Sequence, residues 1–191
     1  MSLLAYSAVL AATYYAHVRY FKVDVVFYGA MLDAVLAAVI TLVALYVARF
    51  LTPFNPFERI QLAAIWMLCG YVFAISIPTV IDRSLSFYIL EKLQQRGGGI
   101  RQDRFAEIFT QEYVREHRLV DVRLTEQQES GTIKIEEGCV KLTERGERLA
   151  QLSTFFRKNL LPKQRLLMGS YTDELTDPFR RSDKTVTYEC H

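Results

Sequence analysis

The chain has 191 residues, of which 51% are hydrophobic, and its formal net charge is +2. This near-neutral balance argues against a domain that wraps nucleic acid, because phosphate contacts usually require a clear basic excess. The charges are also unevenly spread: residues 1–81 hold seven charged side chains, whereas the rest of the chain holds 19 Lys and Arg against 18 Asp and Glu. The sequence therefore predicts a membrane sector over residues 1–82, followed by a water-soluble part.

Three apolar segments in the first part predict transmembrane helices over about residues 2–21, 25–51 and 60–81. A helix needs roughly 20 apolar residues to cross the hydrocarbon core, and the second and third segments supply them comfortably. The first segment is shorter. It carries Tyr14, Tyr15 and His17 where a signal peptide would have small residues before its cleavage site, so we expect a retained helix. Between the second and third segments, Pro53 and Pro56 predict a tight turn.

The basic residues predict the orientation of these helices. Three spans place the first loop and the C-terminal part on the same side of the membrane. That side has five nearby Lys or Arg residues, against two in the second loop. Because cytoplasmic loops are enriched in Lys and Arg, we expect the N-terminus outside and the soluble part in the cytoplasm. The expected location is the cytoplasmic (inner) membrane, with a multi-pass topology.

The second helix carries features that predict a partner within the membrane. Ala30, Ala34 and Ala38 recur every four residues, and such a small-residue stripe lets another helix approach closely. Asp33 lies beside the stripe, about two turns into the helix, where a carboxylate needs a cation, a polar group or water. It predicts a contact with a partner helix or a substrate path. The alternatives are a side chain that snorkels to a nearby interface, or a bond to one of the two tyrosines of the first helix.

The soluble part, expected over residues 83–162, alternates helical and strand periodicity. Helices are predicted over 84–95, 101–117 and 119–129, a hairpin over 132–135 and 139–142, and a last helix over 143–160. Gly97, Gly98 and Gly99 end the first of these helices, and Pro162 stops the last.

This order of three helices, a hairpin and a helix is the winged-helix arrangement. The stretch Val140–Leu149 contains a Leu-Thr-x-x-Gly run and resembles the end of the wing in many bacterial winged-helix domains. The upstream stretch Glu129–Ile133 is similar to the exit from their recognition helix. The resemblance covers residues 84–160 only. It implies an α+β domain of a family that most often binds DNA.

The charges on the expected recognition surface favour a protein partner over DNA. The third helix of the soluble part has an acidic balance, and the hairpin turn carries Glu136 and Glu137. Carboxylates held close to phosphates repel them. We therefore predict a protein-interaction surface formed by Asp121, Arg123, Glu126 and Gln127.

Residues 163–191 are expected to form a juxtamembrane basic segment and a tail. Four cations at the junction alternate with apolar residues and can lie on anionic lipid headgroups, each adding about 1 kcal/mol; they are Arg157, Lys158, Lys163 and Arg165. Phe155, Phe156 and Leu160 are expected in the core of the soluble domain. Gly169–His191 is polar without periodicity, which predicts an extended arm or disorder.

Motifs for catalysis are missing from the sequence. It has no phosphate loop, no nucleophile elbow and no His-rich metal motif, and its three histidines are scattered. We therefore predict no cofactor and no metal. The three cysteines show neither a disulfide framework nor a metal-ligand spacing, and we expect them to be reduced; they are Cys69, Cys139 and Cys190.

Together these features predict a mainly α protein that is a non-catalytic accessory subunit. It would dock on a larger integral membrane protein, for example one that makes or exports envelope glycan, and would contact membrane lipids. One alternative is a membrane-anchored winged-helix transcription regulator. Another is a membrane enzyme that uses Asp33 or Asp82.

Overall fold

The computed structural model describes residues 2–182 and residue 190. In this part the chain is mainly helical, with two small antiparallel hairpins. It separates into two compact units, Met1–Leu119 and Val120–His191, here called unit 1 and unit 2. The boundary predicted at residue 82 lies inside unit 1.

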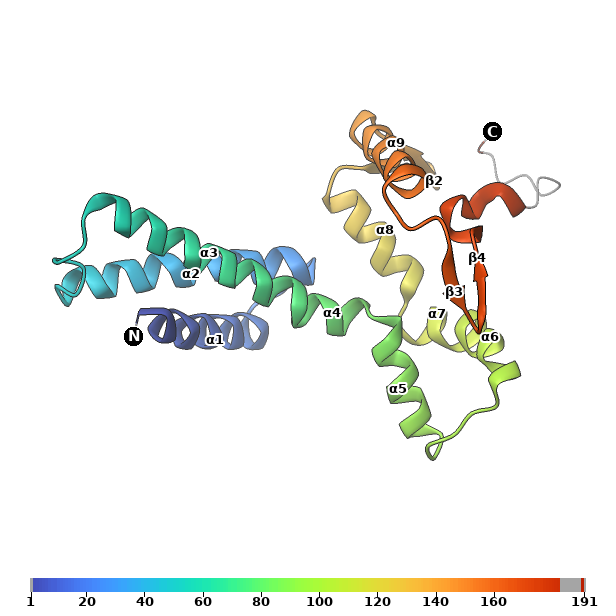
Figure 1. Ribbon diagram of the computed structural model, residues 1–191, viewed down its shortest axis with the longest axis horizontal. Helices are drawn as coiled ribbons and strands as arrows, with labels where there is room; N and C mark the ends of the chain where they lie inside the picture. Colours follow the sequence, from blue (N-terminus) through green and yellow to red (C-terminus); the bar gives the residue numbers. More distant parts are fainter. Residues whose placement is uncertain (1, 183–189, 191) are drawn as a thin grey trace. The chain divides into compact units, whose positions relative to one another are not determined.

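Unit 1 begins with three helices that pack side by side (Figure 1). They are α1 (Ser2–Tyr20), α2 (Val26–Val47) and α3 (Pro56–Ser76). The ring of Tyr6 stacks on Trp66, with centroids 5.8 Å apart, at the centre of their core. Within the described residues, two helical stretches are long and apolar enough to cross a membrane, Val26–Val47 and Pro56–Arg83. The first predicted helix is therefore present, but the structure shows two candidate spans and not three.

The helix ends follow from local chemistry. Asn55 and Glu58 cap the start of α3 reciprocally, each side chain accepting from the other residue's backbone N–H at 2.9 and 2.8 Å. A break at Ile77 separates α3 from α4 (Pro78–Arg83), because Pro78 has no N–H to continue the ladder. The second helix ends at Val47, before the predicted residue 51, and Arg49 then adopts a positive φ of 55°.

The rest of unit 1 is helical and begins with α5 (Leu85–Gln95), which ends at Gly97 and Gly98 with φ of 83° and 93°. The helix predicted over 101–117 is a run of short helical elements. They are η1 (Gln102–Arg104), α6 (Phe105–Glu107), the π-helical η2 (Ile108–Tyr113) and α7 (Val114–Glu116). Tyr88, Ile108 and Tyr113 form their small core.

The next elements lie close to the ranges predicted from the sequence. They are α8 (Leu119–Glu129), β1 (Ile133–Glu136), β2 (Cys139–Leu142) and α9 (Glu144–Asn159). The Thr143 hydroxyl accepts from the N–H of Gly146 at 3.1 Å and caps α9. A Cβ on Gly146 would overlap the carbonyl oxygen of Thr132, which explains the glycine of the Leu-Thr-x-x-Gly run. The element order of a winged helix is thus present, but α5–α7 belong to unit 1 and the hairpin to unit 2, so a winged-helix domain is not shown.

The tail differs from the sequence prediction. Met168 and Gly169, both with positive φ, turn the chain between β3 (Arg165–Leu167) and β4 (Ser170–Thr172). Two short 3₁₀ helices follow, η3 (Glu174–Thr176) and η4 (Pro178–Arg181). Arg180 donates to both carboxylate oxygens of Asp173, at 2.7 and 3.0 Å. The prediction of an extended or disordered arm is therefore wrong up to Ser182; residues 183–189 and 191 lie outside the described part.

Candidate functional site

A polar pair joins His17 of α1 to Asp33 of α2. The His17 Nδ1 lies 2.8 Å from Asp33 Oδ1, and with Asp33 ionised the ring nitrogen is the donor, because a carboxylate can only accept. The Asp33 side chain is 1% exposed and the imidazole 17%. The other oxygen, Asp33 Oδ2, is buried and has no hydrogen-bond partner among the described residues. One carboxylate oxygen is therefore satisfied, and the other remains able to accept.

Asp33 lines a cavity of about 220 Å³ between α1 and α2. The walls are apolar apart from Tyr14, His17 and Asp33, and the rings of Tyr14 and Phe21 form part of them. The described residues that line it include neither Lys nor Arg. The cavity therefore presents acceptor groups, aromatic rings and one imidazole.

The partner of Asp33 was only partly predictable. Of the expected alternatives, the structure contains the bond to the first helix, but the donor is His17 and not Tyr14 or Tyr15. Antiparallel helices joined by a short connection bring together residues at similar distances from that connection. His17 lies one turn before the end of α1 and Asp33 two turns after the start of α2. The short connection was therefore only a partial signal: it brings the last turn of α1 beside the first turns of α2 but does not select this pair.

The small-residue stripe of α2 is used inside the bundle. Ala30 and Ala34 are 1% and 0% exposed, and Ala38 is half-buried. The Tyr6 hydroxyl donates to the Ala34 carbonyl at 3.3 Å, and a Cβ added to Gly70 of α3 would lie 2.5 Å from the Ala34 Cβ. The close approach that the stripe allows is made by the chain's own helices. A partner helix would therefore meet other faces of this bundle.

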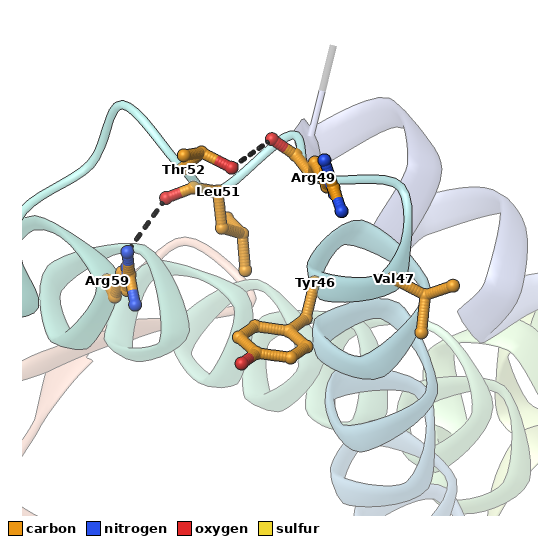
Figure 2. A pocket seen from close by; sticks show the side chains of 6 residues that line it. All are labelled: Tyr46, Val47, Arg49, Leu51, Thr52 and Arg59. Atoms are coloured by element: carbon orange, nitrogen blue, oxygen red, sulfur yellow. Dashed lines mark hydrogen bonds between the residues drawn. The ribbon is translucent and has the colours of Figure 1, made fainter.

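A second cavity, of about 590 Å³, lies at the turn between α2 and α3 (Figure 2). Arg59 donates to the carbonyls of Leu51 and Phe54 at 3.1 and 3.0 Å, and the Thr52 hydroxyl donates to the Arg49 carbonyl at 2.7 Å. The guanidinium of Arg59 thus serves to hold the turn. Arg49 is exposed, at a level suited to lipid headgroups if α2 and α3 span a membrane.

An ion-pair network ties α5 to the helical run that follows it. The Lys92 ammonium is 4% exposed and lies 2.6 Å from both Glu112 and Glu116, and the Tyr88 hydroxyl donates to Glu116 at 2.9 Å. The hydrogen bonds from Lys92 lower the pKa of both carboxyls below their usual range. Burial, followed by the hydrogen bond to Glu116, raises the pKa of Tyr88. The charged groups of this network are paired with one another, so we assign the network a structural role.

Lys92→Met should destabilise unit 1 at neutral pH, because Glu116 would lose its cation and lie one helical turn from Glu112, which would keep only Arg96 as a partner. The depressed carboxyl pKa values stabilise the native fold above about pH 4.3, and that contribution is lost as the pH falls through the lowered values. The wild type should therefore lose thermal stability in acid. The variant should lose less, because the Glu116 carboxylate, left without a cation, gains from protonation.

The measurement for this prediction is the thermal unfolding midpoint at pH 7 and pH 4 in one detergent. Lys141→Met is the matched control, because it removes the cation of the exposed pair with Glu136 and should change little. Parallel acid dependence in the wild type and Lys92→Met would contradict the assigned role.

The four predicted surface residues of α8 lie on its exposed or half-exposed positions. Arg123 pairs with Glu126 at 2.8 Å, and Gln127 accepts from the Thr132 hydroxyl through both its backbone and its side-chain oxygen. Asp121 is exposed to solvent. Gln127 thus fixes the exit from α8, and Arg123 and Glu126 pair within the helix, so contacts inside the unit occupy part of this surface.

Of the four predicted membrane-surface cations, one meets an acid that lies well apart from it in sequence. Lys158 lies 3.4 Å from Asp177, and Arg157 donates to a backbone carbonyl of η3 at 3.4 Å. Lys163 and Arg165 are exposed. The sequence around these cations has no acid, but the folded tail brings Asp177 to Lys158. The two exposed residues, Lys163 and Arg165, therefore remain as candidates for lipid contact.

A disulfide joins Cys139 of β2 to Cys190, with their Cα atoms 6.0 Å apart. The structure therefore pairs two of the cysteines that were expected to be reduced, although they lie 51 residues apart in sequence. Cys69 of α3 is free. Spacing gave no signal because the bridge joins residues that are distant in sequence.

Within residues 2–182 and 190, no group of three or more His, Cys, Asp or Glu side chains is arranged to hold a metal ion. Neither a known protein family nor a curated protein nor a solved structure matches the chain. The indications of its function are therefore its own exposed surfaces and polar side-chain pairs.

Proposed function

We propose that this chain is a non-catalytic adaptor subunit of a membrane complex, anchored by the bundle and recruiting a partner protein through unit 2. The observation that carries the proposal is the lack of a core in unit 2. Of its described residues, only Thr132 and Gly146 are buried. A folded unit that leaves its large apolar side chains in water has the composition of a protein-interaction site.

The strongest part of this surface is a stripe on α9. Leu149, Leu152, Phe156 and Leu160 recur at spacings of three and four residues and so share one helix face. They are 47%, 59%, 47% and 60% exposed, and the neighbouring Phe155 is 58% exposed. These residues were expected in part to fill a domain core. Their exposure instead supports a helix face that a partner covers.

The membrane half of the proposal places α1, α2 and α3 across the cytoplasmic membrane, with unit 2 in the cytoplasm. The 19 residues of α1 rise about 28 Å, close to the roughly 30 Å of the hydrocarbon core. The larger number of Lys and Arg around the first loop and from the end of α4 onward supports the orientation. Purification in mild detergent should recover a stoichiometric integral membrane partner. A chain that stays alone in several detergents would contradict the adaptor role.

Leu152→Arg should release the partner of unit 2, because it puts a charge in the middle of the α9 stripe. Truncating or charging a central apolar contact commonly costs about 2 kcal/mol or more, so we expect at least a roughly 30-fold weaker association. Gln151→Arg adds the same charge to the same helix outside the stripe and should retain the partner. The measurement is the yield of partner recovered with a tagged chain, normalised to membrane expression. Equal recovery of the partner with both variants would show that the α9 stripe is not part of the interface.

The alternative of a membrane-anchored transcription regulator draws support from the element order α8–β1–β2–α9. The negative charge of these elements opposes DNA binding, because DNA phosphates are negative as well. The β1–β2 turn carries Glu136 and Glu137, and α8 carries three acids against one Arg. Specific, strongly salt-dependent retention of a DNA duplex by the full chain would favour this alternative over the adaptor.

A further inference from the structure

We propose that the cavity at His17 and Asp33 binds a primary ammonium group. The inference does not depend on the adaptor role, since it concerns the bundle and not unit 2. It starts from an acceptor that the fold buries and leaves without a donor, Asp33 Oδ2. Such an atom costs free energy unless a ligand or water supplies the missing hydrogen bond.

The charge of the site selects a cation. His17 already donates to Asp33 Oδ1, so only Oδ2 is left for a ligand. An ionised carboxylate in a region of low dielectric constant is stable only when it is paired with a cation and hydrogen-bonded. Among the described residues, His17 is the only lining group that can carry a positive charge, and its Nδ1 already serves Oδ1, so a donor for Oδ2 must come from outside the lining.

The volume and lining of the site admit an N–H donor larger than water. The cavity of about 220 Å³ exceeds many times the roughly 10–15 Å³ that one water needs. The rings of Tyr14 and Phe21 can face a cation. A primary ammonium offers both positive charge and N–H groups for Oδ2, whereas a quaternary ammonium offers charge alone.

Two sources of this chemistry can reach the cavity. Val18 and Phe21 are 48% and 69% exposed, so the cavity opens at the surface of the bundle beside the end of α1. In a membrane-spanning bundle, the end of a helix lies near the lipid headgroups. The ligand is thus either the headgroup of an aminophospholipid or a small free amine.

The first test uses the full chain in nanodiscs of phosphatidylcholine, with ¹⁵N-labelled histidine at fixed pH and ionic strength. The His17 signal is the one that His17→Gln removes. Methylammonium chloride should shift this signal saturably, and tetramethylammonium chloride should not, because it has no N–H to donate. Equal shifts with both salts, or none with either, would overturn the proposal and leave water as the donor.

The second test separates the two sources. Replacing half of the phosphatidylcholine with phosphatidylethanolamine keeps the headgroups zwitterionic but adds N–H donors. A shifted His17 signal without added salt would identify the lipid headgroup, whereas a response to methylammonium alone would identify a free amine. Asp33→Asn should abolish the response, and Asp24→Asn, which removes an exposed carboxylate nearby, should preserve it. A response that survives Asp33→Asn would contradict the site, and the comparison of salts on the unaltered chain decides the matter if that variant does not fold.

Discussion

Gly70→Leu should disrupt the three-helix bundle of unit 1 more than any other single change in α3. A Cβ at residue 70 would already lie 2.5 Å from the Ala34 Cβ and would overlap the Tyr6 hydroxyl. Both neighbours are themselves fixed, since Tyr6 donates to the Ala34 carbonyl and stacks on Trp66. Overpacking a tight core costs about 1–3 kcal/mol. We expect the upper end, because neither helix backbone can retreat without opening the core.

Trp66 supplies a direct measurement, since it is the only tryptophan of the chain and is fully buried. In Gly70→Leu its emission should shift to the red, and the thermal midpoint in detergent should fall. Val72→Leu lies on the same helix at a position that is 56% exposed, and should leave both values near the wild type. If Gly70→Leu kept the wild-type emission and midpoint, α3 would not pack on α2 through Gly70.

The sequence predicted those parts of the fold that local chemistry decides. The α9 cap needs only Thr143 and the three residues after it, and the end of α5 needs only Gly97 and Gly98. The β1–β2 hairpin follows from alternating strands on either side of Glu137 and Gly138, which both adopt positive φ. Each of these signals lies within a few residues of the element that it sets.

What the sequence did not predict depends on contacts between distant segments. The Ala30–Ala34–Ala38 stripe indicates close helix packing, but not whether the neighbouring helix belongs to the same chain. His17 looks isolated until the α1–α2 connection brings it opposite Asp33. The cation segment after α9 lacks acids in sequence, and only the folded tail brings Asp177 to Lys158. The sequence therefore predicted the carboxylate of the candidate site, but it did not predict the histidine or the cavity.

Alkylation of the cysteines should give a nearly all-or-none result that tests the topology. Cys139 and Cys190 have Cα atoms 6.0 Å apart, inside the range of about 4.4–6.8 Å that a disulfide spans. A reducing cytoplasm keeps such a pair as thiols, and the structure corresponds to its oxidised form. Acid-quenched cells, denatured and treated with a maleimide–polyethylene glycol, should therefore show a chain carrying three adducts, one for each cysteine.

Treating the same cells with diamide before quenching should reduce this number to one, on Cys69. Diamide takes two electrons and two protons from the two thiols, which leaves the Cys139–Cys190 bridge. Cys190→Ser should carry two adducts with or without diamide, because Cys139 then lacks its partner. Cys69→Ala should carry two adducts before oxidation and none after it. A single adduct in untreated wild-type cells would show the bridge already closed in the cell. Unit 2 would then face an oxidising compartment, and the orientation inferred from Lys and Arg would have to be reversed.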